Sequence, residues 1–230
     1  MRVIIGAVAT AFVMAATTAS AADLSQKAAD RIKEAVTVLQ EIHAVPDKDI
    51  PQELWEKAEC VIVIPNLKKA AFIIGGEFGK GLMSCREKGN WSAPVFMELQ
   101  KGSWGLQVGA ESIDLVLLVM NRDGVKDLLD NEFKFGANAS VAAGPVGRQG
   151  EASTDASLNA QILAYSRAKG LFAGLSLEGA SLRVDKDANK DFYGTTISTE
   201  DMVRGITKTT PAGSQWTATL TRLVPASSTR

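Results

Sequence analysis

The sequence is short of the side chains on which metal sites and many catalytic sites depend. Its 230 residues include one histidine, His43, and two cysteines, Cys60 and Cys85. A structural zinc site takes four such ligands, so these three residues cannot complete one. His43 is also the only imidazole that a serine–histidine pair could use. We therefore expect no metal, no cofactor and no enzymatic activity.

The sequence also lacks an excess of charge of either sign. It has 25 basic and 26 acidic residues, and loss of the leader that is predicted below would remove only Arg2, which leaves 24 basic residues against 26 acidic ones and a net charge of −2. Such a balance provides no whole-molecule attraction to nucleic acid or to anionic lipid. We expect no nucleic-acid partner, and any anion must be bound by a local group of cations.

No apolar run approaches the length of about 20 residues that a membrane-spanning helix needs. Residues 1–22 contain one cation, Arg2, then an apolar run that ends in threonines, then the small residues Ala19–Ala22. This order is typical of a secretory signal peptide. We expect cleavage after Ala21 or Ala22, and a mature protein that is periplasmic or secreted and associates with the membrane only peripherally.

Export to an oxidising compartment would permit a disulfide between Cys60 and Cys85. The predicted strand geometry argues against that pairing. Pro65–Asn66 is a turn signal, and a hairpin that turns there would place Cys60 opposite Gly75 or Gly76, well before Cys85. A disulfide and two buried thiols both remain open.

The first residues after the leader predict an amphipathic helix. Apolar residues recur there at steps of three and four, which places them on one helical face: Leu24, Ala28, Ile32, Ala35, Leu39 and Ile42. A helix that lies on a membrane has a richly basic polar face. The polar face here carries both signs, so we expect the helix to pack on the domain, with membrane contact as the alternative.

Glycines and a nearly apolar segment, Ile113–Met120, predict a bent sheet. The segment is typical of a buried core strand. Glycine within a strand marks a bend, a bulge or a close approach, and the strand-like region before it contains Gly75, Gly76, Gly79, Gly81, Gly102, Gly105 and Gly109. We predict an α+β fold: a glycine-bent antiparallel sheet approaching a barrel, with helices at the N-terminus, in the middle and at the C-terminus. It forms one domain over residues 23–224, followed by a disordered tail at 225–230.

The acidic segment Asp185–Asp191 has oxygen-bearing side chains at alternate positions, as a calcium-binding loop does. Lys190 stands where such a loop needs glycine, and Thr196 stands where it needs the closing glutamate. We therefore predict an acidic hairpin turn that does not bind calcium.

Several short motifs follow one another along the chain in the order of a known family. They are Trp91–Pro94, Ala142–Arg148, Tyr165–Arg167, Lys169–Phe172, Gly174–Gly179 and Asn189–Gly194. Together they resemble the signature of the SYLF-domain family. The resemblance implies a non-enzymatic module whose eukaryotic members bind phosphoinositide membranes and, in some cases, actin.

Five cations are candidates for binding a lipid headgroup. They are Lys68 and Lys69 at the expected tip of the first hairpin, Arg148 in a glycine–proline loop, and Arg167 with Lys169 before the central strand. Cations and bare loop amides are the groups that bind phosphate in proteins. The residues and the resemblance together predict non-enzymatic binding of anionic phospholipid or phosphoinositide-like headgroups. The alternative is a structural or adaptor protein of the cell envelope that binds a protein partner.

Overall fold

The computed structural model describes residues 14–44, 49–71, 74–104, 109–129, 132–136, 141–144, 160–168, 171–173 and 177–224. The helices in these ranges are α1 (Met14–His43), α2 (Gln52–Lys57), α3 (Arg122–Leu129), α5 (Lys186–Tyr193), α6 (Thr199–Val203) and α7 (Pro211–Leu223). The strands are β1 (Cys60–Ala71), β2 (Ile74–Glu87), β3 (Asn90–Trp91), β4 (Val95–Trp104), β5 (Gly109–Val119), β6 (Phe133–Lys134), β7 (Val141–Ala143), β8 (Ile162–Ala168), β9 (Leu171–Ala173) and β10 (Ser181–Val184).

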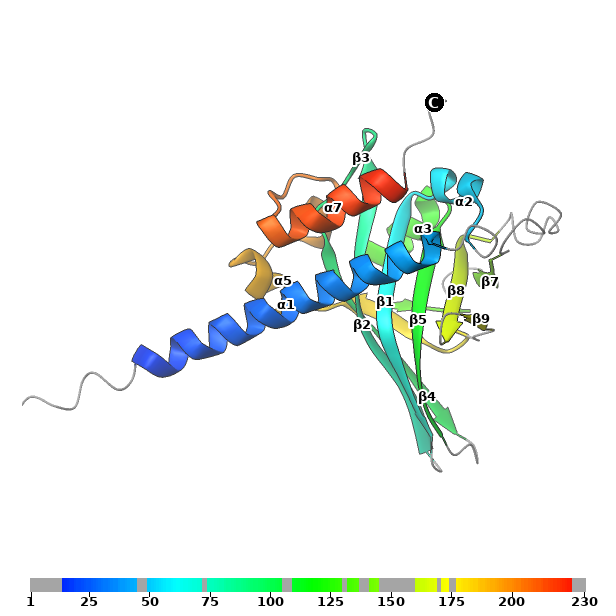
Figure 1. Cartoon of the computed structure of the whole chain (residues 1–230), viewed down its shortest axis with the longest axis horizontal. Coiled ribbons are helices and arrows are strands. Elements are labelled where there is room, and N and C mark those ends of the chain that lie inside the picture. The colour runs from blue at the N-terminus through cyan, green and yellow to red at the C-terminus, as the bar shows by residue number, and fades with distance from the viewer. Residues whose placement is uncertain are drawn as a thin grey trace, which may run out of the picture.

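The strands form one strongly curled sheet in the order β6-β10-β4-β2-β1-β5-β8-β7, with β3 paired to β2 and β9 paired to β8 (Figure 1). Every pair is antiparallel except β7 with β8, which is parallel. The β1–β2 hairpin is nested between β4 and β5. The predicted α+β class, with a curled sheet and helices near both ends and in the middle, is confirmed.

Two hydrophobic cores lie on the two faces of the central strands. Because side chains alternate along a strand, Val61 and Val63 pack on the core that contains α1, α2 and α7, whereas Ile62 and Ile64 pack on the opposite core. The predicted core strand, β5, alternates in the same way and is buried from Leu115 to Val119. A strand buried on both faces explains the nearly continuous apolar sequence.

Helix α1 packs on the domain, as its mixed-charge polar face predicted. Its apolar stripe is buried: Ala28, Ile32, Ala35, Leu39 and Ile42. Helix α7 lies beside it across the same face of the sheet (Figure 1). The expected cleavage site at Ala21 or Ala22 falls within α1, and cleavage there stays a prediction. No helix in the described ranges is both long and apolar enough to cross a bilayer.

The predicted turn at Pro65–Asn66 is wrong, because β1 continues through it to Ala71. The pairing of β1 with both neighbours shifts register there, and Asn66 has a positive φ of 52°. This local kink is a β-bulge. The backbone N–H of Asn66 donates to Asp114 Oδ1 on β5 at 3.1 Å, so a side chain of the neighbouring strand replaces a ladder bond.

The longer β1 places Cys60 directly opposite Cys85 on β2, and the two form a disulfide. The expectation that Cys60 faces Gly75 or Gly76 is wrong for the same reason as the predicted turn. Gly75 and Gly76 pair instead with Ala71 and Ala70, near the far end of the hairpin. Of the two alternatives for the cysteines, the structure has the disulfide.

The predicted hairpin turn at Asp185–Asp191 is also wrong, because the segment after Asp185 is helix α5. Asp185 is the N-cap residue, and its Oδ1 accepts from the N–H of Ala188 at 3.1 Å. The side chain of Asn189 bonds both the N–H and the carbonyl of Phe96, which fixes α5 to β4. Asp185 and Asn189 therefore serve helix capping and packing.

Motifs far apart in the sequence meet in the fold. A Cβ added to Gly144 would overlap the ring of Tyr165, so the glycine makes room for the tyrosine. Likewise, the hydroxyl of Tyr193 donates to the carbonyl of Pro94 at 2.6 Å. Much of the sequence signature thus specifies contacts between elements.

Candidate functional site

The described candidate cations do not converge on one exposed point. Lys68 and Lys69 lie within β1 and not at a hairpin tip, and consecutive strand residues point to opposite faces. Lys68 is exposed, whereas Lys69 Nζ lies 3.7 Å from Glu77 Oε1. Arg148 and Lys169 lie outside the described residues.

Arg167 on β8 is a buried ion-pair residue. Its guanidinium donates to Glu41 on α1 and, at 3.2 Å, to Asp114 on β5, and the Arg167 side chain is only 9% exposed. Asp114 in turn accepts the N–H of Asn66 at the β1 bulge. Arg167 therefore ties the N-terminal helix to the centre of the sheet.

Arg167→Ala is expected to lower the free energy of unfolding by about 2 kcal/mol, because Asp114 is left partly buried without its cation. The loss stays below that of a fully buried pair, since Glu41 is half-exposed. Thermal and urea unfolding measure it. Arg204→Ala, which breaks an exposed pair with Glu200, is the control and should change stability by less than about 0.5 kcal/mol. Equal losses in the two variants would contradict the assignment.

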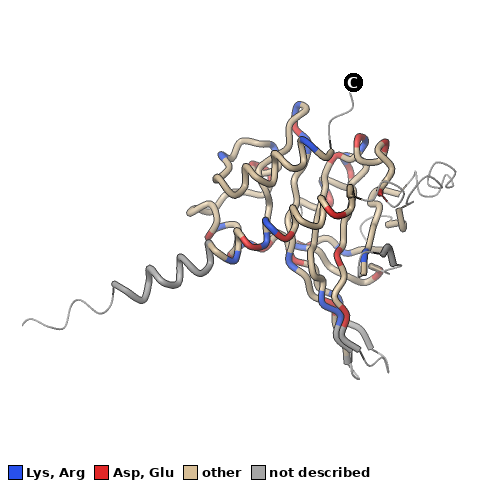
Figure 2. Tube along the Cα trace, in the orientation of Figure 1, with Lys and Arg blue, Asp and Glu red and all other residues tan. Residues whose placement is uncertain are grey.

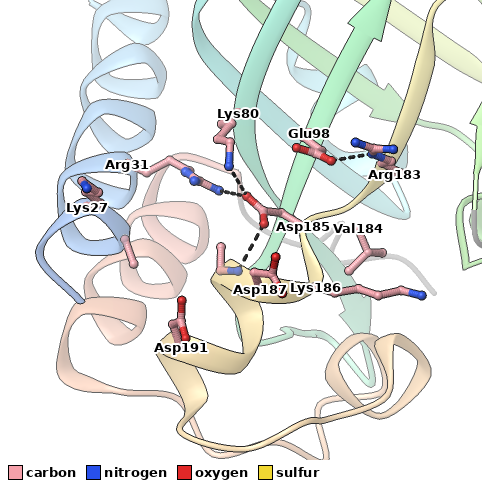
Figure 3. A pocket seen from close by; sticks show the side chains of 12 residues that line it. Lys27, Arg31, Lys80, Glu98, Arg183, Val184, Asp185, Lys186, Asp187 and Asp191 are labelled. Carbon is pink, nitrogen blue, oxygen red and sulfur yellow. Dashed lines mark hydrogen bonds and ion pairs between the residues drawn. The ribbon is translucent and has the colours of Figure 1, made fainter. Parts of the chain in front are cut away.

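A charged cavity of about 630 Å³ lies between α1, the β2–β4 face of the sheet, and the junction of β10 with α5 (Figure 3). We call it the Asp185 cavity. It is lined by Lys27, Ala28, Arg31, Lys80, Glu98, Arg183, Val184, Asp185, Lys186, Asp187, Ala188 and Asp191. Five basic and four acidic side chains from five separate elements thus surround one opening, a feature that the sequence analysis missed.

Asp185 stands at the centre of this charge cluster. Its Oδ2 accepts from Lys80 Nζ at 2.8 Å and from Arg31 at 3.1 Å. Burial by itself raises the pKa of Asp185, but the hydrogen bonds from Lys80 and Ala188 and the charges of Lys80 and Arg31 outweigh burial and hold that pKa below its ordinary value. The carboxylate stays ionised and holds both cations in place.

Further contacts surround Asp185 and its two cations, Lys80 and Arg31. The Arg31 guanidinium lies 5.2 Å from the centroid of the Phe96 ring, and Arg183 donates to Glu98 on the neighbouring strand. Arg31 and Asp185 are nearly buried, whereas the Lys80 side chain is 41% exposed. Lys80 is therefore the central cation that a ligand in the opening can reach.

The Asp185 cavity continues into a second hollow along α1. This groove, of about 490 Å³, shares Lys27, Arg31 and Lys80 with the cavity and extends to Lys68 and Phe78. Among the sequence-predicted cations that the structure describes, Lys68 is the one that lines this groove beside Lys27, Arg31 and Lys80. The sequence signal for the cluster was weak, because its members come from positions as far apart as 27 and 191.

Comparison with known proteins identifies the family of this chain. Residues 100–223 match the model of the Ysc84 family, described as "Las17-binding protein actin regulator". The chain is 36% identical over 170 residues to LAS seventeen-binding protein 3 of Saccharomyces cerevisiae, which covers 72% of this chain. The chain belongs to the Ysc84 family. The SYLF resemblance of the motifs is thereby confirmed.

Further Ysc84-family relatives include SH3 domain-containing YSC84-like protein 1 of Xenopus laevis, 34% identical over 172 residues or 74% of this chain. This chain spans only 37% of the yeast relative and 50% of the Xenopus one. The name of the yeast relative describes a protein that binds LAS seventeen, and neither name mentions a reaction. The part of this chain that matches the family model, residues 100–223, includes β5, β8, β10, α5 and α7.

Proposed function

We propose that this protein binds anionic lipid headgroups at a membrane surface, without catalysis, and that the Asp185 cavity is the headgroup site. One observation carries the proposal: five cations converge on one open cavity. They are Lys27 and Arg31 on α1, Lys80 on β2, Arg183 on β10 and Lys186 at the start of α5. The lining has one more cation than carboxylates, although the chain as a whole has one fewer.

Lys80 and Arg31 retain hydrogen-bonding capacity toward a phosphate. An ammonium has three donor hydrogens and a guanidinium has five. Lys80 and Arg31 share Asp185 as an acceptor, so the carboxylate orients them without using all of their donors. Charge-assisted hydrogen bonds from such groups are the strong ones in phosphate binding. Asp185 therefore holds Lys80 and Arg31 in position before an anion enters the opening.

The chemistry of the cavity favours binding over catalysis. Its described lining consists of lysine, arginine, aspartate, glutamate, alanine and valine, and supplies no hydroxyl, thiol or imidazole. A general base works best when its pKa lies near the operating pH. The lowered pKa of Asp185 moves this carboxylate in the opposite direction.

The test is cosedimentation with vesicles of equal parts phosphatidylcholine and phosphatidylglycerol, at low and raised salt. Lys80→Ala with Lys186→Ala should weaken binding about tenfold or more, because each cation contributes about 1 kcal/mol near an anionic leaflet. The control removes two exposed cations outside both hollows, Lys126→Ala with Lys134→Ala, and should bind as the parent does. Equal binding by both double variants would sink the proposal.

A protein partner is the second candidate, favoured by the relatives' names. In that case the protein is an adaptor of the cell envelope, and the parent protein ignores anionic vesicles even at low salt. Of the cations proposed from the sequence, Lys68 borders the groove and belongs to the proposed surface. Arg148 and Lys169 stay predictions, as does the periplasmic location.

A further inference from the structure

The groove beside the Asp185 cavity continues along α1 into a third hollow, of about 510 Å³. The groove and this hollow share two lining residues on each wall: Asp30 and Glu34 on α1, and Pro65 and Asn66 on β1. Because both walls are shared, the two form one continuous depression between the helix and the sheet. We call it the α1 groove.

The two ends of the α1 groove are opposite in charge. The end beside the Asp185 cavity is lined by four basic residues and two acidic ones: Lys27, Arg31, Lys68 and Lys80, with Asp30 and Glu34. The far end is lined by four acidic residues and one basic residue: Asp30, Glu34, Glu41 and Asp114, with Lys33. Figure 2 shows both signs along α1. The charge of the groove therefore changes sign along its length.

Charged groups at both ends are available to a ligand. Lys68 and Glu34 are exposed, and neither forms an ion pair with another described residue. Arg167 offsets part of the acidic end through its pairs with Glu41 and Asp114, but the Glu41 side chain is still 55% exposed. The basic end can therefore attract an anionic group, and the acidic end a cationic one.

The middle of the groove offers hydrogen-bonding groups and an aromatic ring. Pro65 and Asn66 lie in the bulge of β1 and are in register with neither neighbouring strand. The exposed side chain of Asn66 accepts from the Ser112 hydroxyl at 3.4 Å. A side-chain amide has two donor hydrogens and an acceptor oxygen, which are the groups that complement a peptide backbone. Phe78, 43% exposed, adds an apolar surface at the basic end.

We infer that the α1 groove binds an extended peptide segment of a protein partner, with an acidic residue at the Lys68 end and a basic residue at the Glu41 end. Charge complementarity selects this occupant. A nucleic acid has no cation for the acidic end, and a polyamine has no anion for the basic end. A zwitterionic lipid headgroup carries both charges, but only a few bonds apart. The inference goes beyond headgroup binding and does not depend on it.

The length of the groove fits such a segment. An α-helix rises about 1.5 Å per residue, so the span from Lys27 to Glu41 is about 21 Å. An extended chain rises about 3.3 Å per residue, so about six residues cover that span. The acidic and basic residues of the partner segment should therefore be separated by about four to six positions.

The partner segment and a headgroup phosphate would use some of the same cations. Lys27, Arg31 and Lys80 line both the Asp185 cavity and the α1 groove. An acidic residue at the basic end of the groove thus engages groups that a phosphate in the cavity also needs. We expect the two ligands to compete.

The test begins with random dodecapeptides displayed on phage and selected on the purified parent protein. Enriched sequences should contain an acidic and a basic residue about four to six positions apart and in one constant order, because the groove has a single polarity. Failure to enrich a shared sequence, or a shared sequence that lacks either charge, would overturn the inference.

Charge reversals then locate the peptide. The enriched sequence, made as a synthetic peptide, should bind Glu34→Lys about tenfold more weakly than the parent in calorimetric titrations, because an attraction becomes a repulsion. Glu53→Lys makes the same change on α2, outside the groove, and should bind as the parent does. At the basic end, Lys68→Glu should weaken binding and its control Lys126→Glu should not.

Thermal unfolding of all four variants should stay within a few degrees of the parent, since the replaced side chains are exposed. A loss of affinity in a folded variant then reports a lost contact. Equal affinity of the peptide for Glu34→Lys and Glu53→Lys would contradict the placement in the α1 groove.

Glycerophosphate separates this inference from the proposed headgroup site. If both sites exist, glycerophosphate should raise the apparent Kd of the peptide, and simultaneous binding without loss of affinity would place the peptide outside the groove. No NMR shifts with glycerophosphate, together with weakened peptide binding by Glu34→Lys, removes the headgroup site and leaves the groove. Intact glycerophosphate binding with no enriched peptide removes the groove and leaves the cavity.

Discussion

Gly81→Ala is expected to lower the free energy of unfolding by about 3 kcal/mol, because the structure has no room for a methyl group at this position. A Cβ on Gly81 would collide with the carbonyl oxygen of Val63 and lie 2.9 Å from the Cα of Ile64. Both are backbone atoms of β1 beside its bulge, so they cannot rotate away as a flexible side chain would. Strands β1 and β2 would have to move apart at the bulge, where their backbones lie close together.

Gly102→Ala is the matched control, since it makes the same change in a neighbouring strand where an added Cβ meets nothing within 4 Å. It should leave stability within about 0.5 kcal/mol of the parent. Urea unfolding followed by circular dichroism measures both variants. If Gly81→Ala were as stable as Gly102→Ala, the close approach of β1 and β2 at the bulge would be refuted.

Replacing both cysteines, Cys60→Ala with Cys85→Ala, is expected to lower the free energy of unfolding by about 3 kcal/mol. An unfolded chain without a cross-link of this loop length has more conformational entropy, which favours unfolding. The two residues are 25 apart in sequence and pair directly across β1 and β2. A reductant should lower the melting temperature of the parent and leave the double variant unchanged.

Intact-mass spectrometry provides an independent check of the bond. The parent should gain the mass of two alkyl groups on thiol labelling only after reduction and unfolding. Labelling of both thiols without reductant would show that Cys60 and Cys85 are free. A stability loss in the double variant would then have to come from two emptied core positions, since both residues are buried.

Elements with local signals could be predicted from the sequence. The apolar stripe of α1 follows from its three- and four-residue spacing, and the buried pattern of β5 follows from its composition. The expected middle helix, α3, has a local start signal, because Asn121 Oδ1 accepts the N–H of Gly124 at 2.9 Å. In each case the deciding interaction lies within a few residues of the signal.

The two errors of local structure arose where a distant partner decides the conformation. Pro65–Asn66 has turn composition, but the N–H of Asn66 bonds to Asp114, 48 residues later, and the strand continues. Asp185–Asp191 has the composition of an acidic turn, but Asn189 in this segment bonds to Phe96, 93 residues earlier, and the segment is helical. No periodicity within a short window contains that information.

In the candidate site, too, local sequence signals identify some residues and only the fold brings the others together. Lys68 was selected as a cation at the expected tip of the first hairpin; it lies within β1 instead, but it does border the groove. Arg167 was selected from a motif, but the motif position serves the ion pairs with Glu41 and Asp114. The Asp185 cavity is assembled from separate elements, so only the folded chain brings its cations together.

The nested arrangement of the hairpins sets an order of assembly. Among the four central strands, β1 and β2 are joined by the shortest connection and contain both cysteines, so the disulfide holds their pairing even in an unfolded chain. Strands β4 and β5 then add to the two open edges of a hairpin whose register is already fixed covalently. A chain that refolds with the disulfide intact therefore searches fewer strand registers than a reduced chain, because β4 and β5 add to a template that already exists.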